Sequence, residues 1–225
     1  MIIRENIIEV PDINPKNVLN YEENNHILDE TIFFDLEHYV YKVPICIGVF
    51  GCCYYDCKIK ALKVTQYMLE NRSDSQLIVN MSKKYFVDMY KVGKRNIVTF
   101  SGNNDFTVIN YLLSKYKIHF NFDNFDKLDI QEVYKQRTGI CTGLKTMEKN
   151  FNIIRESETI SGSNLAKTFG KMMKDEQYVK RMPKEKIEKI LLYNEQDVVN
   201  LFNIMSSWYM FVKAKESSVQ NGSEP

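Results

Sequence analysis

The sequence lacks the features that would place a chain in or across a membrane. None of its apolar runs approaches the roughly 20 residues that a membrane-spanning helix needs. The first residues, 1–6, carry charge where a secretory leader would have an apolar core. We therefore expect a cytoplasmic protein without a membrane partner.

The chain also lacks a strong excess of charge of either sign. Its 30 basic and 29 acidic side chains give a formal net charge of +1. A protein that grips a long nucleic-acid duplex usually shows a stronger basic excess. The composition therefore favours a chain that either binds a short stretch of strand or gathers its Lys and Arg locally.

The five cysteines form neither a disulfide pattern nor a complete set of metal ligands. Their number is odd, and in the expected cytoplasmic location their thiols stay reduced. Alternation along a strand would place Cys53 and Cys57 on one face and Cys52 on the other. Because no histidine or second cysteine pair completes a site, we interpret the cysteines as small buried hydrophobic residues, with a structural metal site as the alternative.

What the sequence does contain is enough apolar and aromatic material for one domain. Hydrophobic residues make up 44% and aromatic residues 12% of the 225 residues, which suits one substantial α/β domain and is short for two. We expect an irregular N-terminal arm over 1–30, one domain over 31–212, and a disordered tail rich in Ser, Glu and Gly over 213–225.

Strand-like and helix-like patterns both occur in the expected domain. Five runs predict strands, at 31–36, 45–50, 54–59, 95–100 and 119–125. Helical spacing predicts helices at 62–71, 79–91 and 106–116, and a helical C-terminal region at 128–137, 143–150, 162–174 and 184–211. Short links favour antiparallel pairing of the first three strands. We therefore expect an α/β fold with a central mixed five-stranded sheet, the 31–36 strand at its centre, flanked by helices.

Two carboxylates share one face of the first predicted strand. Asp35 and Glu37 are two residues apart, so they project from the same side about 7 Å from each other. A strand covered by helices is buried, and a buried carboxylate is costly unless it is paired or bound to a metal ion. The alternative is a strand end at which both side chains simply reach solvent.

Two further acids have both a structural and a functional interpretation. Asp105 follows the 95–100 strand, near the carboxyl edge where α/β sites commonly form, but it is also suited to cap the next helix. Tyr193 and Asp197 are four residues apart on the last predicted helix, so they lie one turn apart on the same face. A surface Tyr–Asp pair is the alternative for these two residues.

Taken in order, these residues resemble the DEDD superfamily of 3′–5′ exonucleases, in its tyrosine-bearing branch, and within it the YprB-type ribonuclease H-like domains. The resemblance covers about residues 30–210. It is carried by FFDLE (33–37), NIVTFSGNNDF (96–106), GLKTMEKNF (143–151), the Ile-Ser-Gly of 160–162, and LLYNEQDVVNL (191–201). It implies a ribonuclease H-like fold.

The chain departs from this family pattern at two positions. His38 stands where relatives commonly have Thr, and Asp105 precedes Phe106, whereas in many relatives an aromatic residue comes before this Asp. Asp129 resembles a family Asp that lies outside the metal-binding set. We expect Asp129 to cap a helix or to position the metal-binding residues without contacting the metal ions itself.

The resemblance implies a two-metal-ion exonuclease that hydrolyses phosphodiester bonds of DNA or RNA from a 3′ single-stranded end and releases nucleoside monophosphates. Asp35, Glu37, Asp105 and Asp197 would bind two Mg²⁺ or Mn²⁺ ions about 3.5–4 Å apart, because carboxylate oxygens suit such hard cations. Asp35 would bridge both ions, and Tyr193 would orient the attacking water. These five residues form the expected catalytic set.

Two other functions remain open from the sequence. One is a catalytically silent ribonuclease H-like module that binds nucleic acid, and the other is a metal phosphohydrolase for small molecules. A groove lined by Lys and Arg that leads to Asp35 would favour a polymer substrate. Candidates for its lining are Lys83, Lys84, Lys94, Arg95 and the basic residues of 167–189, although such residues often only solvate helix faces.

Overall fold

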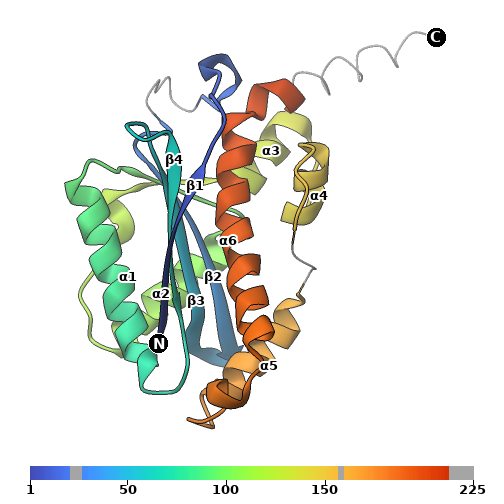
Figure 1. Cartoon of the computed structure of the whole chain (residues 1–225). Helices are drawn as coiled ribbons and strands as arrows, with labels where there is room; N and C mark the ends of the chain where they lie inside the picture. The colour runs from blue at the N-terminus through green and yellow to red at the C-terminus, as the bar shows by residue number, and fades with distance from the viewer. Residues whose placement is uncertain (21–26, 157–159, 213–225) are drawn as a thin grey trace.

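The computed structural model describes residues 1–20, 27–156 and 160–212, which form a mixed sheet between two layers of helices (Figure 1). The strands lie in the order β1-β4-β3-β2-β5-β6. Pairing is antiparallel from β1 to β2 and parallel from β2 to β6. The strands are β1 (Ile2–Glu9), β2 (Thr31–Tyr41), β3 (Val43–Asp56), β4 (Ala61–Met68), β5 (Asn96–Thr99) and β6 (Asp126–Asp129).

Helices cover both faces of this sheet, as predicted. Alternation along β2 divides the core, because Ile32 and Phe34 pack on the side of α1 and α2 while Phe33 packs under α6. Figure 1 shows α6 running along one face and α5 crossing near one end of the sheet. The helices are α1 (Asp74–Lys91), α2 (Asn103–Lys115), α3 (Ile130–Thr138), α4 (Leu144–Asn150), α5 (Gly162–Met172) and α6 (Lys184–Ser206). Short 3₁₀ turns occupy Pro15–Asn17, Phe122–Asn124 and Val179–Arg181.

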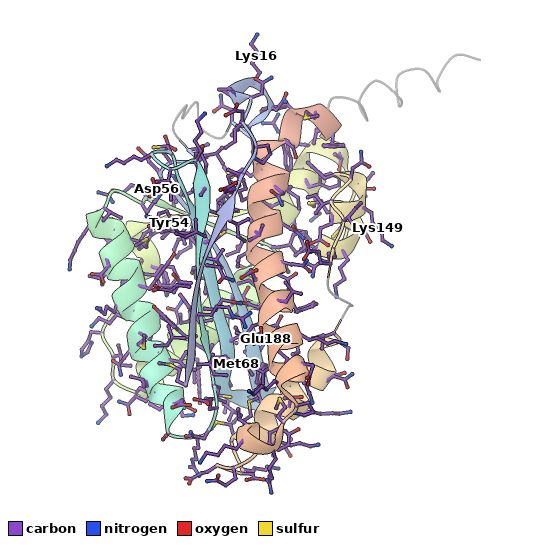
Figure 2. All side chains as sticks on the ribbon, viewed as in Figure 1. Lys16, Tyr54, Asp56, Met68, Lys149 and Glu188 are labelled. Carbon is purple, nitrogen blue, oxygen red and sulfur yellow. The ribbon has the colours of Figure 1, made fainter. Side chains whose placement is uncertain are left out.

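The sheet has six strands rather than the predicted five, because the expected irregular arm contains β1. This strand pairs with β4 along its whole length. Asn6 donates to Glu195 at 2.5 Å, and Arg4 pairs with Glu188, which Figure 2 labels on α6. Isoleucines lie on both faces of β1, and Ile7 is 67% exposed. The polar–apolar alternation that predicts a strand is therefore missing at this sheet edge.

The antiparallel part of the sheet is also arranged differently from the prediction. The predicted 45–50 strand and the first half of the predicted 54–59 strand belong to one strand, β3, which continues through Gly51 and ends at Asp56. The third antiparallel strand is β4, in the segment 62–71 that was predicted to be a helix. Side chains of β4 are buried on both faces, so the segment carries no period of two. The strand predicted at 119–125 instead begins at Asp126, after a 3₁₀ turn.

The remaining predictions agree with the structure to within a few residues at most boundaries. Strand β2 lies between β3 and β5, which confirms that the Asp35 strand is central. The last helix ends at Ser206 rather than at 211. The tail predicted at 213–225 lies outside the described residues. In the described part of the chain, no helix is long and apolar enough to cross a membrane.

A close approach between α5 and β3 fixes the position of this helix over the sheet. A Cβ atom added at Gly48 would lie 2.3 Å from the ring of Phe169, whose side chain is fully buried. Because an aromatic ring in a packed core cannot retreat by an ångström without moving its neighbours, only glycine fits at this position.

We therefore predict that Gly48→Ala lowers the free energy of unfolding by about 1–3 kcal/mol, the usual cost of forcing extra volume into a packed core. Urea denaturation followed by circular dichroism measures this change. Gly162→Ala is the matched control, since a Cβ there meets no atom within 4 Å. Equal unfolding midpoints for the two variants would contradict this packing account.

Candidate active site

Three of the predicted carboxylates meet between the central strand and α6. Asp35 and Glu37 project from β2 toward Asp197 on α6, and one carboxylate oxygen of each lies within 4.8 Å of the others. Asp197 is 6% exposed, whereas the two strand residues are partly exposed. The group is therefore backed by the core and open to solvent on one side.

Asp105 approaches this group from the other face of the sheet but does not belong to the set of three. Its carboxylate accepts a hydrogen bond from the backbone N–H of Leu36, the residue between Asp35 and Glu37. Helix α2 begins at Asn103 after Gly102, so Asp105 is not its N-cap. Burial, followed by the charge of Asp35, raises the pKa of Asp105 well above its ordinary value, and the charge of Asp105 in turn contributes to the raised pKa of Glu37. The role of Asp105 as a metal ligand stays a prediction.

The loop that leads to α2 and Asp105 is held by Asp129, which also caps a helix as expected. The carboxylate of Asp129 accepts hydrogen bonds from the backbone N–H groups of Ser101 at 3.0 Å and Gly102 at 3.1 Å. It also accepts from the N–H of Gln131 at 3.0 Å and so caps α3. One carboxylate therefore joins the start of α3 to the β5–α2 loop.

A row of residues across three strands fixes the orientation of Asp35. In the sheet register, Asp35 lies opposite Gly51, and Gly51 lies opposite Gln66. The missing side chain of Gly51 leaves space for Asn194 of α6, since a Cβ there would lie 2.1 Å from the Asn194 amide oxygen. Asn194 donates to Asp35 at 3.0 Å and accepts from Gln66 at 2.8 Å. Sequence reasoning missed this role of Asn194, although it adjoins Tyr193.

A buried arginine that sequence reasoning also missed is the counter-ion of Asp197. Arg155 pairs with Asp197 and donates two hydrogen bonds of 2.6 Å to Glu148 of α4. Glu148 is 2% exposed and also accepts from Asn200 at 2.9 Å. The Nη1 group of Arg155 is buried without a hydrogen-bond partner in the described part of the chain. The segment 143–151 was matched only by family resemblance, and its Glu148 is the residue that positions Arg155.

Two cations lie close to the ring of Tyr193. The Nζ atom of Lys145 lies 4.8 Å from the ring centroid, and the guanidinium carbon of Arg155 lies 5.3 Å from it. Burial, followed by the charges of Asp197 and Glu37, raises the pKa of Tyr193 above its ordinary value. The hydroxyl therefore stays protonated at neutral pH and suits positioning rather than proton abstraction.

Burial and mutual repulsion hold the carboxylates partly protonated. Burial, with a further contribution from the charge of Asp197, raises the pKa of Asp35 to about 8. Burial and the neighbouring carboxylates raise the pKa of Glu37 well above its ordinary value. Burial raises the pKa of Asp197 to about 6, against the opposing effect of Arg155. The cluster is fully ionised at neutral pH only with added positive charge, and its oxygen donors suit a hard divalent cation.

The other candidates from the sequence do not join this site. Cys46, Cys52 and Cys53 are buried, while Cys57 and Cys141 are exposed, and all five thiols are free. Among the described residues, none of them belongs to a group with metal-ligand geometry. The interpretation as small buried hydrophobic residues is therefore confirmed for Cys46, Cys52 and Cys53, and it is wrong for Cys57 and Cys141, which are exposed.

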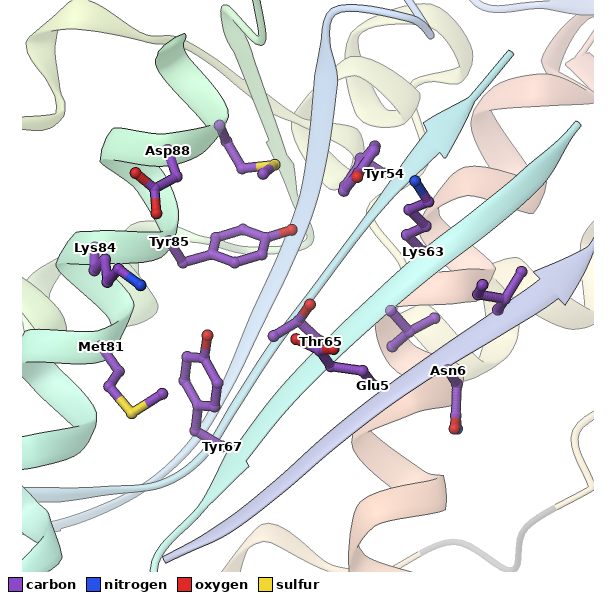
Figure 3. A pocket seen from close by; sticks show the side chains of 13 residues that line it. Glu5, Asn6, Tyr54, Lys63, Thr65, Tyr67, Met81, Lys84, Tyr85 and Asp88 are labelled. Atoms are coloured by element: carbon purple, nitrogen blue, oxygen red, sulfur yellow. The ribbon is translucent and has the colours of Figure 1, made fainter. Parts of the chain in front are cut away.

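A cavity of 570 Å³ lies away from the carboxylates, between α1 and strands β1, β3 and β4 (Figure 3). Tyr54, Tyr67 and Tyr85 line it. Basic and acidic residues line it as well, and the acidic ones include Glu5 and Asp88. None of the five expected catalytic residues lines it. The candidate chemistry therefore lies at the acidic cluster and not at this cavity.

Comparison with known proteins supports the assignment of the fold. A family model described as the RNase_H superfamily matches residues 32–209. This range contains all of the carboxylates described above, together with Arg155 and Tyr193. No similar protein was found among the curated proteins.

Replacing the Asp35 charge should stabilise the metal-free protein increasingly as the pH rises. The pKa of this carboxyl is raised from 3.8 to about 8, so its contribution to stability is complete below about pH 4 and is lost as the pH rises through about 8. We therefore predict that Asp35→Asn gains stability relative to the wild type between about pH 5 and pH 8. Urea titrations in EDTA at several pH values measure the difference.

Asp12→Asn is the control for this pH dependence. Asp12 is exposed, and Lys60 lowers its pKa, so its contribution to stability does not change in this pH range. Added Mg²⁺ should stabilise the wild type more at about pH 8 than at about pH 6, because the ion competes with protons for the carboxylates. A pH-independent difference between Asp35→Asn and the wild type would contradict the charge account.

Proposed function

The chain belongs to the ribonuclease H superfamily, and within this superfamily we propose that it is a metal-dependent 3′–5′ exonuclease that releases nucleoside monophosphates from DNA or RNA. Ribonuclease H-like domains are generally nucleases that act on nucleic acids with divalent metal ions. The proposal rests on one observation above all, the carboxylates of Asp35, Glu37 and Asp197 with oxygens within 4.8 Å of one another.

The donor set suits two Mg²⁺ or Mn²⁺ ions. Asp35, Glu37 and Asp197 would hold them, with Asp105 contributing from α2. When bound, such ions activate water and stabilise the charge that develops on the phosphate. The sheet presents Asp35 and Glu37 from one rigid strand, and Asn194 keeps the Asp35 carboxylate in a single orientation through its 3.0 Å hydrogen bond.

The neighbouring side chains provide for the rest of the reaction. The protonated hydroxyl of Tyr193 would orient the attacking water. Lys145 and Arg155, both close to this ring, would place positive charge next to the position of a phosphate. Glu148 fixes the guanidinium of Arg155 through two hydrogen bonds, so its positive charge is held at one position beside the carboxylates.

One observation favours the alternative function, a catalytically silent module that binds nucleic acid. The ion pair between Arg155 and Asp197 neutralises one of the expected metal ligands. If this pair persists in the presence of metal ions, the guanidinium takes the place of a cation. The exonuclease proposal requires that Asp197 also accepts a metal ion.

We predict that the purified protein shortens single-stranded DNA or RNA from the 3′ end with Mg²⁺ or Mn²⁺ and not with EDTA. Asp35→Ala should abolish this activity, because its carboxylate is proposed to contact both ions. Tyr193→Phe should retain a weak residual activity, since loss of a positioning or acid–base group typically costs on the order of 10²–10⁴-fold. Gel electrophoresis of 5′-labelled strands measures the stepwise shortening.

Asp12→Ala, which removes a fully exposed carboxylate, should cleave like the wild type. A circular single strand tests whether cleavage requires a free end, because it has none and should stay intact. Cleavage of the circle would replace the exonuclease with an endonuclease. If neither metal supports degradation of any strand or raises the melting temperature of the wild type, the silent binding module becomes the better account.

A further inference from the structure

A second cavity, of 700 Å³, lies where the ends of β2 and β3 meet α1, α2 and α5. Three cations and three tyrosines line it, and its lining contains no carboxylate. We call it the basic–tyrosine cavity, after Arg72, Lys115, Lys174, Tyr39, Tyr41 and Tyr116. The balanced overall composition of the chain allows such a local gathering of positive charge.

The three cations of this cavity form no salt bridge with the described residues. Acids close to them in the sequence are already engaged elsewhere. Glu70 and Asp74 pair with the amino group of Met1, and Asp175 pairs with Arg181. None of these cations is therefore paired with a carboxylate of the described residues, although Lys115 donates to the carbonyl of Ile45 at 3.4 Å, and this arrangement suits an anion.

The tyrosines of the cavity differ in how firmly they are held. The ring of Tyr39 lies against Gly170 of α5, where an added Cβ would approach it to 3.3 Å. The hydroxyl of Tyr116 is hydrogen-bonded to Ser75. Tyr41 is 64% exposed, so a face of its ring is free. An exposed ring beside unpaired cations suits a nucleic-acid base that stacks while its phosphates contact Lys and Arg.

The basic–tyrosine cavity lies along the same strand as the acidic cluster. Tyr39 is four residues beyond Asp35 on β2, about 13 Å at the usual rise of a strand. Lys94, another of the predicted basic residues, is engaged inside the fold. Lys94 is 5% exposed and donates to the backbone carbonyls of Asp29 and Tyr55. Among the predicted basic residues, Lys174 from the 167–189 group is the one that lines this cavity.

We propose that the basic–tyrosine cavity binds the single strand a few nucleotides upstream of its 3′ end. Arg72, Lys115 and Lys174 contact the phosphates, and a base stacks on Tyr41. Stacking on a side chain requires a base that is free of its neighbours, which favours a single strand over a duplex. This inference rests on the proposed nuclease function and assigns the part of the substrate that does not react.

Binding measured without metal ions tests the cavity independently of catalysis. Fluorescence anisotropy in EDTA compares labelled strands of about 12 and about 3 nucleotides, as DNA and as RNA. We expect Arg72→Ala combined with Lys174→Ala to weaken binding of the longer strand at least about tenfold, and that of the shorter strand less. The slope of log affinity against log salt should fall by about 1–2, since each lost phosphate contact contributes roughly one.

A double variant with the same loss of charge is the control. Lys16→Ala combined with Lys58→Ala removes two exposed cations that do not line the cavity, and Figure 2 shows Lys16 at the opposite end of the molecule from α5. This control should bind like the wild type. Tyr41→Ala should weaken binding of the longer strand on the order of tenfold, whereas Tyr41→Phe should restore it, because the ring rather than the hydroxyl stacks.

Two results would overturn the proposal. The first is that the cavity variants and the Lys control bind the longer strand with equal affinity. The second is that the wild type binds neither strand. The exonuclease proposal can fail while the cavity proposal stands. This is the outcome if the wild type degrades no strand with added metal ions and the cavity variants still bind the longer strand more weakly than the wild type does. Comparison of the DNA and RNA arms then identifies which strand the cavity prefers.

Discussion

Repulsion between carboxylates that are held close together in a partly buried site is the constraint on which the structure depends. Water stabilises ionised carboxylates, and the core behind Asp197 removes much of that water. Oxygens of three such groups lie within 4.8 Å of one another. Burial, and after it repulsion from Asp197, favours the protonated form in the absence of a cation, which is why the pKa of Asp35 rises to about 8.

The surrounding fold holds this unfavourable arrangement in place from three directions. Gly51 admits Asn194, which fixes Asp35 from α6. Asp129 ties down the loop that leads to α2 and its acid. Arg155 supplies a positive charge to the α6 carboxylate from the segment that follows α4. The same rigidity that offsets repulsion in the metal-free protein also preorganises the oxygens for a divalent ion, so stability and the proposed catalysis depend on the same contacts.

Local spacing was enough to predict the parts of the site that lie on one element. Alternation in β2 placed Asp35 and Glu37 together, and the four-residue interval on α6 was predicted to place Tyr193 one turn from Asp197. Strand β4 was mistaken for a helix because burial on both faces removes its alternation. Arg155 and Asn194 were missed because their partners lie 42 and 159 residues away, and no local pattern encodes such pairs.

The most direct test of the central claim is a crystal structure of the protein soaked in Mn²⁺, with anomalous diffraction measured near the manganese edge. If the carboxylates are built to hold divalent ions, anomalous peaks should appear between Asp35, Glu37 and Asp197, with Asp197 contacting the ion. If saturating Mn²⁺ gives no peak there and Asp197 remains paired only with Arg155, the cluster is not a metal centre and the account fails.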